Sequence, residues 1–226
     1  MSRSATHMPL AILGGTFDPV HIGHLRVALE AADALAAELR LMPASVPPHR
    51  AQPVATAAQR VAILKAALAG QDRLRLDERE LSRPGRSYTI DTLIELRQEI
   101  GHDRSLILLL GRDAFCGLPS WHRWRELFQH AHIGVLGRPG HTMSMPDELA
   151  NELAPRWITL PTVVDHGAFG KVFEIAVSAL EISATAIREL LRRGGDPRYL
   201  LPDAVVDDAS LLMPYSSNRA GDAING

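Results

Sequence analysis

Two histidines and two glycines near the start of the chain have the residue types and spacing that could hold a phosphate chain. They lie in the run GGTFDPVHIGH, residues 14–24, in which His21 and His24 are three positions apart. That spacing puts both imidazoles on one face of a helix, and the start of a helix offers unpaired amides and a positive dipole end to an anion. Gly14 and Gly15 let the backbone approach a ligand closely. The segment therefore predicts a phosphate site.

Zinc binding is the alternative for two imidazoles at the start of a helix. The sequence shows no third ligand at a suitable spacing from His21 and His24. The double glycine beside the pair favours the phosphate interpretation, as does Gly23, which leaves room for a flat group over the helix.

A second candidate phosphate site is the run ISATAIR, residues 182–188. Ser183 and Thr185 are good N-cap residues, and the amides after them are free to bind anions. Arg188 then lies about one turn into the helix, where it could grip a phosphate with two N–H groups. Taken alone, the pattern also fits an ordinary capped helix with a surface arginine.

Alternating strands and helices must position these segments. Short apolar runs predict strands, and apolar residues at helical spacing predict helices. The predicted strands are residues 10–13, 40–42, 74–76, 106–110, 133–136 and 157–160, and the predicted helices are 22–39, 57–68, 87–100 (capped by Ser87 or Thr89) and 184–193.

This alternation predicts an α/β fold, a Rossmann-like parallel sheet flanked by helices on both faces in a single domain. We expect the domain over residues 8–215, with flexible tails at 1–7 and 216–226. Ligands bind such sheets beyond the carboxyl ends of the strands, where the strand order reverses. Because glycines end two strands, at Gly14 and Gly111, we expect both turns to open on one crevice.

The composition is that of an ordinary globular protein: 226 residues, 46% of them hydrophobic, with a formal net charge of −2. This charge gives the chain no general attraction to nucleic acid or to an anionic membrane. No apolar run is long enough to span a membrane, and the first residues lack the apolar core of a secretory signal. The single cysteine, Cys116, cannot form an internal disulfide and is interpreted as a half-buried or buried residue. We expect a cytoplasmic protein.

The run at residues 14–24 strongly resembles the signature of the HxGH nucleotidyltransferases, the superfamily that includes the catalytic cores of class I aminoacyl-tRNA synthetases. The resemblance implies that His21 and His24 contact the triphosphate of ATP and stabilise the charge that builds on it during in-line displacement. Such a transfer depends on positioning and charge neutralisation, so no enzyme nucleophile is required.

Residues 182–188 resemble the second signature of this family, ISSTxIR, which grips the β- and γ-phosphates. By this match Arg188 is a third catalytic residue, whereas Ala184 replaces the usual second serine and removes one hydroxyl contact. The ATP-binding residues that the resemblance implies are Gly14, Gly15, Thr16, Phe17, Gly23, Gly111, Asp113, Ile182, Ser183, Thr185 and Arg188.

Mg²⁺ is the implied cofactor, because ATP phosphates need screening before an anionic nucleophile can approach them. We assign no protein ligand to the metal. Asp18 could approach Mg²⁺ or simply brace the turn in which it lies.

Further segments narrow the resemblance to nicotinate-nucleotide adenylyltransferases of the bacterial type. The run SYTIDT, residues 87–92, looks like that family's SYTxDT segment, whose backbone amides hold the nicotinate carboxylate. The match implicates Ser87, Tyr88 and Thr89 in binding the acceptor.

The run LGRD, residues 110–113, followed by Trp121, looks like the LGxD…W segment of the same family. By that match Asp113 holds ribose hydroxyls and Trp121 stacks on the pyridine ring, a sensible contact for an aromatic face. Without the resemblance, we would interpret Trp121 as a packing residue.

The run PPHR, residues 47–50, resembles the family's PPHK loop with arginine in place of lysine. This match implicates His49 and Arg50 in holding the phosphate of the mononucleotide. Arginine keeps the positive charge of the family's lysine but offers its donors in a different geometry. Arg60 also matches a basic position, although a solvated charge on a helix face explains it nearly as well.

These resemblances imply that the chain transfers the adenylyl group of ATP to nicotinate mononucleotide. Rival acceptors are nicotinamide mononucleotide or another small molecule, and the rival class is a non-catalytic nucleotide-binding module. The intact His21, His24 and Arg188 argue against a non-catalytic module. The oligomeric state and the role of residues 137–151 stay open, and we interpret the remaining histidines as surface or packing residues: His102, His122, His130, His132, His141 and His166.

Overall fold

A parallel sheet forms the centre of the protein. The computed structural model describes residues 8–45, 52–83, 85, 87–137, 144–159, 167–178 and 180–216. Within them the strands are ordered β3-β2-β1-β4-β5-β6, and every neighbouring pair is parallel. The strands are β1 Leu10–Gly15, β2 Glu38–Pro43, β3 Leu74–Leu76, β4 Leu106–Gly111, β5 His132–Gly137 and β6 Val172–Ala176. The strand order reverses between β1 and β4, which confirms the Rossmann-like topology that the alternation predicts.

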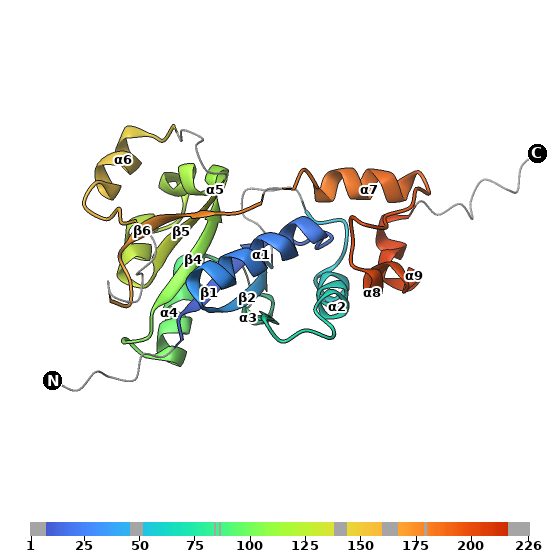
Figure 1. Ribbon diagram of the computed structural model, residues 1–226, viewed down its shortest axis with the longest axis horizontal. Helices are drawn as coiled ribbons and strands as arrows, with labels where there is room; N and C mark the ends of the chain where they lie inside the picture. The colour runs from blue at the N-terminus through green and yellow to red at the C-terminus, as the bar shows by residue number, and fades with distance from the viewer. Residues whose placement is uncertain are drawn as a thin grey trace, which may run out of the picture.

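Helices cover both faces of this sheet, as predicted, and α7, α8 and α9 extend beyond it beside α2 (Figure 1). The α-helices are α1 Ile22–Leu35, α2 Ala57–Ala67, α3 Arg79–Ser82, α4 Thr89–Ile100, α5 Arg112–Cys116, α6 Asp147–Leu153, α7 Ala184–Arg192, α8 Asp203–Val206 and α9 Ala209–Leu212. Short 3₁₀ turns occupy η1 Leu118–Ser120, η2 Trp124–Gln129 and η4 Met213–Tyr215. None of the described helices is long and apolar enough to cross a membrane.

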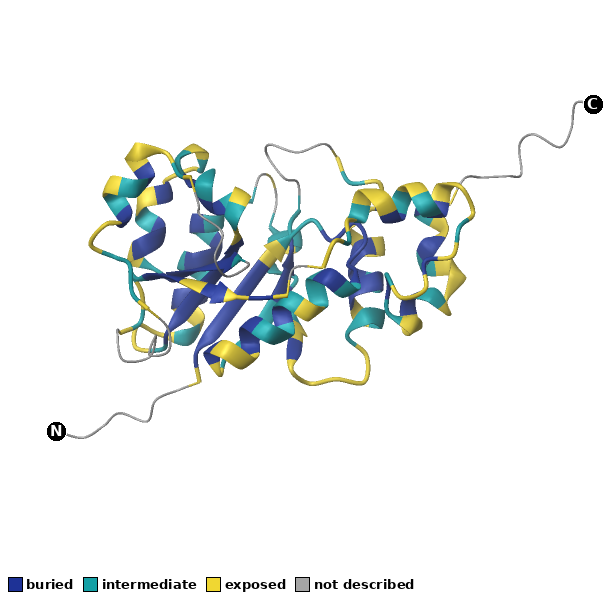
Figure 2. Cartoon of the chain, turned by 45° about the horizontal axis from the view of Figure 1, so that its top comes forward, coloured by how far each residue is buried: buried dark blue, intermediate teal, exposed yellow. Residues whose placement is uncertain are grey.

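Alternate residues of β1 pack into two separate cores, one on each face of the sheet. Ala11 and Leu13 join the core beneath α1, α2 and α7 to α9, whereas Leu10 and Ile12 join the core beneath α4, α5 and α6. This follows from the strand geometry, in which successive side chains point to opposite faces. The buried strands lie between layers of helix in Figure 2.

The first helix ends earlier than the apolar spacing predicts. Ala36 adopts a left-handed conformation with φ of 45° and ends α1 at Leu35. Leu39, which fits the helical pattern, instead lies in β2. A single apolar side chain satisfies a helical and a strand pattern equally well, so spacing alone misplaced this boundary.

The last strand lies elsewhere than predicted. Among the described residues of the predicted strand at 157–160, only Trp157 pairs, through one isolated bridge to Val172. The edge strand is β6, where Glu174 and Ala176 are exposed between buried neighbours. The short helices α3, α5, α6, α8 and α9 also have no counterpart in the prediction, because helices of four to seven residues show too little periodicity.

Candidate active site

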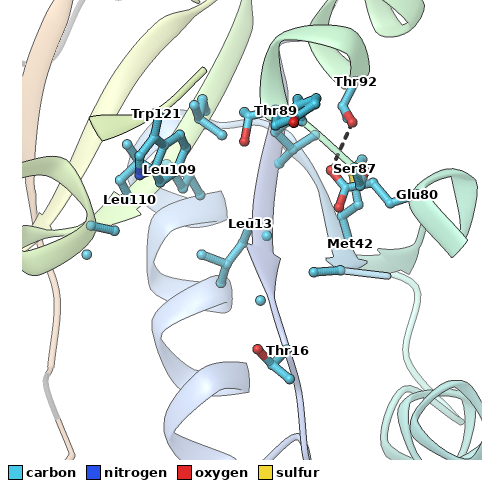
Figure 3. Close-up of a pocket in the computed structure, with 18 of the residues that line it drawn as sticks. Leu13, Thr16, Met42, Glu80, Ser87, Thr89, Thr92, Leu109, Leu110 and Trp121 are labelled. Atoms are coloured by element: carbon cyan, nitrogen blue, oxygen red, sulfur yellow. Dashed lines mark hydrogen bonds between the residues drawn. The ribbon is translucent and has the colours of Figure 1, made fainter. Parts of the chain in front are cut away.

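A pocket of about 350 Å³ opens at the carboxyl ends of β1 and β4. Gly14 and Gly15 line it from β1 and Gly111 lines it from β4, so both glycine turns open on one crevice as predicted. Figure 3 shows Leu13 and Thr16 along its floor and Trp121 on one side. The pocket lies where the strand order reverses, the usual ligand position in such sheets.

The two histidines lie together at the start of α1. His21 is the N-cap residue, and its ring stacks on that of His24 with centroids 3.7 Å apart and planes inclined by 25°. Phe17 packs its ring edge-on against His24 at 5.1 Å. The His24 Nδ1 accepts a hydrogen bond of 3.4 Å from the His21 amide, whereas the buried His21 Nδ1 has no partner among the described residues. The spacing argument therefore correctly placed both imidazoles on one face.

Both imidazoles are neutral at neutral pH. Burial lowers the pKa of His21 from 6.5 to about 4. Burial also lowers the pKa of His24, to about 3, and repulsion from a charged His21 adds to this effect. Each ring therefore carries one N–H donor and one acceptor nitrogen at pH 7, and it can offer that donor to an anion without a positive charge of its own.

We expect the histidine pair to make the folded state sensitive to acid. Between pH 6.5 and about 4 the unfolded chain binds protons at His21 and His24 that the folded chain excludes. The free energy of unfolding therefore falls as the pH falls, by up to about 1.4 kcal/mol per pH unit for each excluded proton. Thermal melting between pH 7.5 and 4.5 measures this slope. A double variant, His21→Gln with His24→Gln, should show a shallower slope, and equal slopes would contradict the neutral pair.

Gly15 and Gly23 occupy positions where a larger residue would collide with its neighbours. A Cβ atom on Gly15 would lie 2.9 Å from the Phe17 ring, and one on Gly23 would lie 3.0 Å from the His21 Nδ1 and 3.6 Å from the Ile182 Cβ. Gly23 therefore lets the ring of His21 and the segment before α7 pack closely against α1, and the space beside it is filled by protein rather than left for a flat ligand.

Asp18 stabilises the turn between β1 and α1 and links this turn to three other segments of the chain. Its carboxylate accepts hydrogen bonds from the amides of Val54 and Ala55, at 2.8 and 3.0 Å, and from the Tyr215 hydroxyl, at 2.8 Å. Its backbone oxygen accepts a further bond of 2.7 Å from Arg188. Because both carboxylate oxygens already have protein partners, Asp18 fits the bracing interpretation and not the metal-ligand one.

The second signature lies directly beside the first. Ser183 caps α7, since its Oγ accepts from the Ala186 amide at 3.1 Å. Thr185 instead accepts a bond of 3.2 Å from the Arg188 Nη2. The guanidinium of Arg188 thus extends from α7 to the turn that contains Asp18, and its side chain is 28% exposed. The two runs, far apart in the sequence, therefore lie side by side, joined by Arg188. His21, His24 and Arg188 are not among the residues that line the pocket at the ends of β1 and β4.

Arg60 is not the solvated helix-face charge that the sequence allowed. It is 1% exposed and donates to the backbone oxygens of Thr16, at 2.6 Å, and Ala44, at 3.0 Å. Thr16 and Ala44 both line the pocket. Arg60 therefore fixes the turns that follow β1 and β2.

The predicted acceptor residues Ser87, Tyr88, Thr89, Asp113 and Trp121 all line the same pocket. The predicted cap of α4 is wrong: the N-cap is Tyr88, and no side chain caps this helix. The first amides of α4 therefore have no side-chain partner, and Tyr88 and Thr89 at its start line the pocket.

Two ionisable side chains that line the pocket were missed by the sequence interpretation. Glu80 lines the pocket from α3, and His122 lines it with its ring 4.4 Å from that of Tyr88. No spacing pattern marks either residue, because each reaches the pocket through tertiary packing. The interpretation of His132 as a satisfied packing residue is confirmed, since its Nδ1 accepts from the Lys171 amide and its Nε2 lies 3.0 Å from the Gly167 oxygen.

His49 and Arg50 lie outside the described residues, as do His141 and His166, residues 1–7 and all but the first residue of 216–226. Cys116 is half-buried, as interpreted, with its thiol 3.4 Å from the Ser144 oxygen. Among the described residues, no group of three or more histidine, cysteine, aspartate or glutamate side chains could hold a metal ion.

Comparisons with known proteins agree with this geometry. The sequence model of the family described as cytidylyltransferase-like matches residues 12–190. A Pseudomonas putida (strain W619) protein named probable nicotinate-nucleotide adenylyltransferase is 51% identical over 207 residues, covering 91% of this chain and 94% of that protein. A Pseudomonas fluorescens protein of the same name is 51% identical, covering 87% of this chain and 92% of that protein.

A solved structure has the same fold. The structure of Plasmodium falciparum nicotinic acid mononucleotide adenylyltransferase complexed with NaAD superposes with a TM-score of 0.67 over 92% of this chain and 96% of that chain. The sequence identity is 16%, so this likeness concerns the fold.

Proposed function

Because the chain belongs to the cytidylyltransferase-like family and, within it, to the nicotinate-nucleotide adenylyltransferases, we propose that this crevice transfers the adenylyl group of ATP to nicotinate mononucleotide. A phosphate oxygen of the mononucleotide attacks the α-phosphorus of ATP. The bond from that phosphorus to the oxygen bridging to the β-phosphorus breaks, and pyrophosphate leaves. The products are nicotinate adenine dinucleotide and pyrophosphate, and no covalent enzyme intermediate forms.

The observation that carries the proposal is the stacked, neutral pair of His21 and His24 beside the guanidinium of Arg188. Donors fixed in advance stabilise charge as it develops on the leaving pyrophosphate, without reorganising during the reaction. Arg188 has five N–H donors, and its bonds to Asp18 and Thr185 leave others for phosphate oxygens.

The acceptor is proposed to bind on the other side of the pocket. The uncapped start of α4 offers amides to the nicotinate carboxylate, and the positive end of the helix dipole favours an anion there. Trp121 lines the pocket with an aromatic face for the pyridine ring, and Asp113, exposed in the first turn of α5, is placed to accept from ribose hydroxyls. His49 and Arg50 are proposed to hold the mononucleotide phosphate.

Mg²⁺ is proposed to enter with ATP, held mainly by phosphate oxygens and water, as this ion often is at nucleotide sites. Asp18 does not fit as its ligand, since both carboxylate oxygens accept protein hydrogen bonds. When bound, the ion screens the phosphate charge. We also propose a cytoplasmic location, where ATP is supplied.

The test is to mix the protein with Mg-ATP and nicotinate mononucleotide and to follow the products by mass. We expect nicotinate adenine dinucleotide and pyrophosphate in equal amounts, and we expect chelation of Mg²⁺ to stop their formation. Hydrolysis of ATP without a dinucleotide product would contradict adenylyl transfer. Nucleotide binding without any turnover would indicate the non-catalytic alternative.

Loss of the Trp121 ring should weaken binding of the mononucleotide. Stacking of an aromatic side chain on a base is worth about 1–3 kcal/mol, so Trp121→Leu should raise the Michaelis constant for the mononucleotide about tenfold, with that for ATP unchanged. Trp121→Phe keeps a π face and should restore most of the affinity. Steady-state kinetics against each substrate measure both values. An unchanged constant in Trp121→Leu would remove this residue from the acceptor site.

A further inference from the structure

Glu80 is a carboxylate inside the pocket for which the proposed transfer has no role. It lies in the short helix α3 and lines the pocket with Ser87 and Thr92. Figure 3 shows these three residues together on the side of the pocket opposite Trp121. The Thr92 hydroxyl donates to the Glu80 Oε1 at 2.8 Å.

Arg83 completes this contact from the end of α3. Its Nη1 donates to the hydroxyl oxygens of Ser87 and Thr92, each at 3.3 Å, and its guanidinium pairs with Glu95 at 2.7 Å. Thr92 therefore donates to Glu80 while it accepts from Arg83, so its hydroxyl is satisfied in both roles. Ser87 lies just before the first turn of α4 and Thr92 at the end of that turn, so α3 holds the turn at both ends.

The contacts of Glu80 and Arg83 stabilise the first turn of α4, which has no side-chain cap of its own. Its N-cap is Tyr88, which offers no side-chain oxygen to the first amides. An uncapped first turn is free to fray. Here the turn must keep a fixed direction if its amides are to distinguish a carboxylate from a carboxamide, since a small displacement of hydrogen-bond donors removes such selectivity.

We infer that Glu80 is a positioning residue that, through Thr92 and together with Arg83, fixes the first turn of α4 and so sets the preference for a pyridine carboxylate over a carboxamide. The inference rests on the proposed function, because it assigns that turn to the acceptor. Burial raises the pKa of Glu80, while the hydroxyls of Thr92 and Ser87 and the charge of Arg83 oppose this and the charge of Asp77 adds to it. Among the described residues, Glu80 therefore holds its hydrogen bonds without forming an ion pair.

The test compares pyrophosphate release from nicotinate and nicotinamide mononucleotides by wild type, Glu80→Ala, Glu80→Gln and Thr92→Val. In Glu80→Ala we expect the Michaelis constant for nicotinate mononucleotide to rise about tenfold. We expect kcat and the Michaelis constant for ATP to stay within about twofold of the wild-type values. The ratio of kcat/KM between the two acceptors should fall by a similar factor. Thr92→Val should behave like Glu80→Ala, and Glu80→Gln should restore most of the ratio, because its amide oxygen still accepts from Thr92.

Glu99→Ala is the matched control. Glu99 also joins α4 to α3, through a bond of 2.6 Å from Arg79, but it does not line the pocket. We expect Glu99→Ala to keep the wild-type ratio of kcat/KM between the two acceptors. The inference is overturned if Glu80→Ala keeps the wild-type ratio, or if Glu99→Ala lowers the ratio equally. A wild-type protein that does not use nicotinate mononucleotide at all would instead refute the proposed function.

Discussion

His24→Ala should lower kcat about a hundredfold while the protein stays folded. Removal of one fixed donor from a site of developing negative charge typically costs 10²- to 10³-fold in rate. His24 is placed for this role by its stacking on His21 and by the edge contact from Phe17, so its ring cannot move away from the start of α1. Single-turnover measurements with saturating Mg-ATP and mononucleotide give the rate of the transfer step itself.

The control for this variant is His102→Ala, which removes an exposed histidine outside the pocket. Its turnover should equal that of the wild type. Circular dichroism and thermal melting should show that His24→Ala keeps its fold. Wild-type turnover in folded His24→Ala would contradict the assignment of this residue to the triphosphate.

Arg188→Ala should lower kcat by a similar factor. Among the described residues of α7, Arg188 is the only arginine whose guanidinium bonds to the turn that precedes His21. Its Nη1 bond to the Asp18 oxygen fixes its direction, and fixed cationic donors stabilise developing phosphate charge most effectively. We expect kcat to fall about a hundredfold. Arg188→Lys keeps the charge but loses the planar fork, so it should recover only part of the rate.

Arg192→Ala is the control on the same helix. Arg192 pairs with Glu189 at 2.7 Å, its side chain is 62% exposed, and it lies one turn beyond Arg188. Its removal should leave kcat within about twofold of the wild type. If both variants lost activity equally, the loss would reflect disturbance of α7, and the catalytic role of Arg188 would be wrong.

Local sequence patterns were sufficient to predict the part of the site that is local in the chain. The strand that ends at two glycines, and the helix that carries His21 and His24, lie within about 25 residues of one another, so periodicity and turn chemistry determine their geometry. The same reasoning placed Gly111 at the crevice. The parallel topology then brings the ends of β1 and β4 together.

The rest of the site depends on contacts that no local pattern records. Asp18 and Tyr215 are hydrogen-bonded across 197 positions of sequence, and Glu80 reaches the pocket only because α3 packs beside α4. Arg60 looks like a surface charge on its helix, yet tertiary packing buries it against three backbone oxygens. Burial and partner choice of polar residues depend on the whole fold, and so they escaped the sequence interpretation.

The central claim is that an uncapped helix start in this pocket receives the carboxylate of a nicotinate mononucleotide while the histidine pair receives ATP. The most direct test measures pyrophosphate release from Mg-ATP with nicotinate mononucleotide and, side by side, with nicotinamide mononucleotide. We predict rapid release with the nicotinate form and at least tenfold lower kcat/KM with the nicotinamide form. Equal rates with both would contradict the carboxylate assignment, and no release with either from folded, ATP-binding protein would contradict the adenylyl transfer itself.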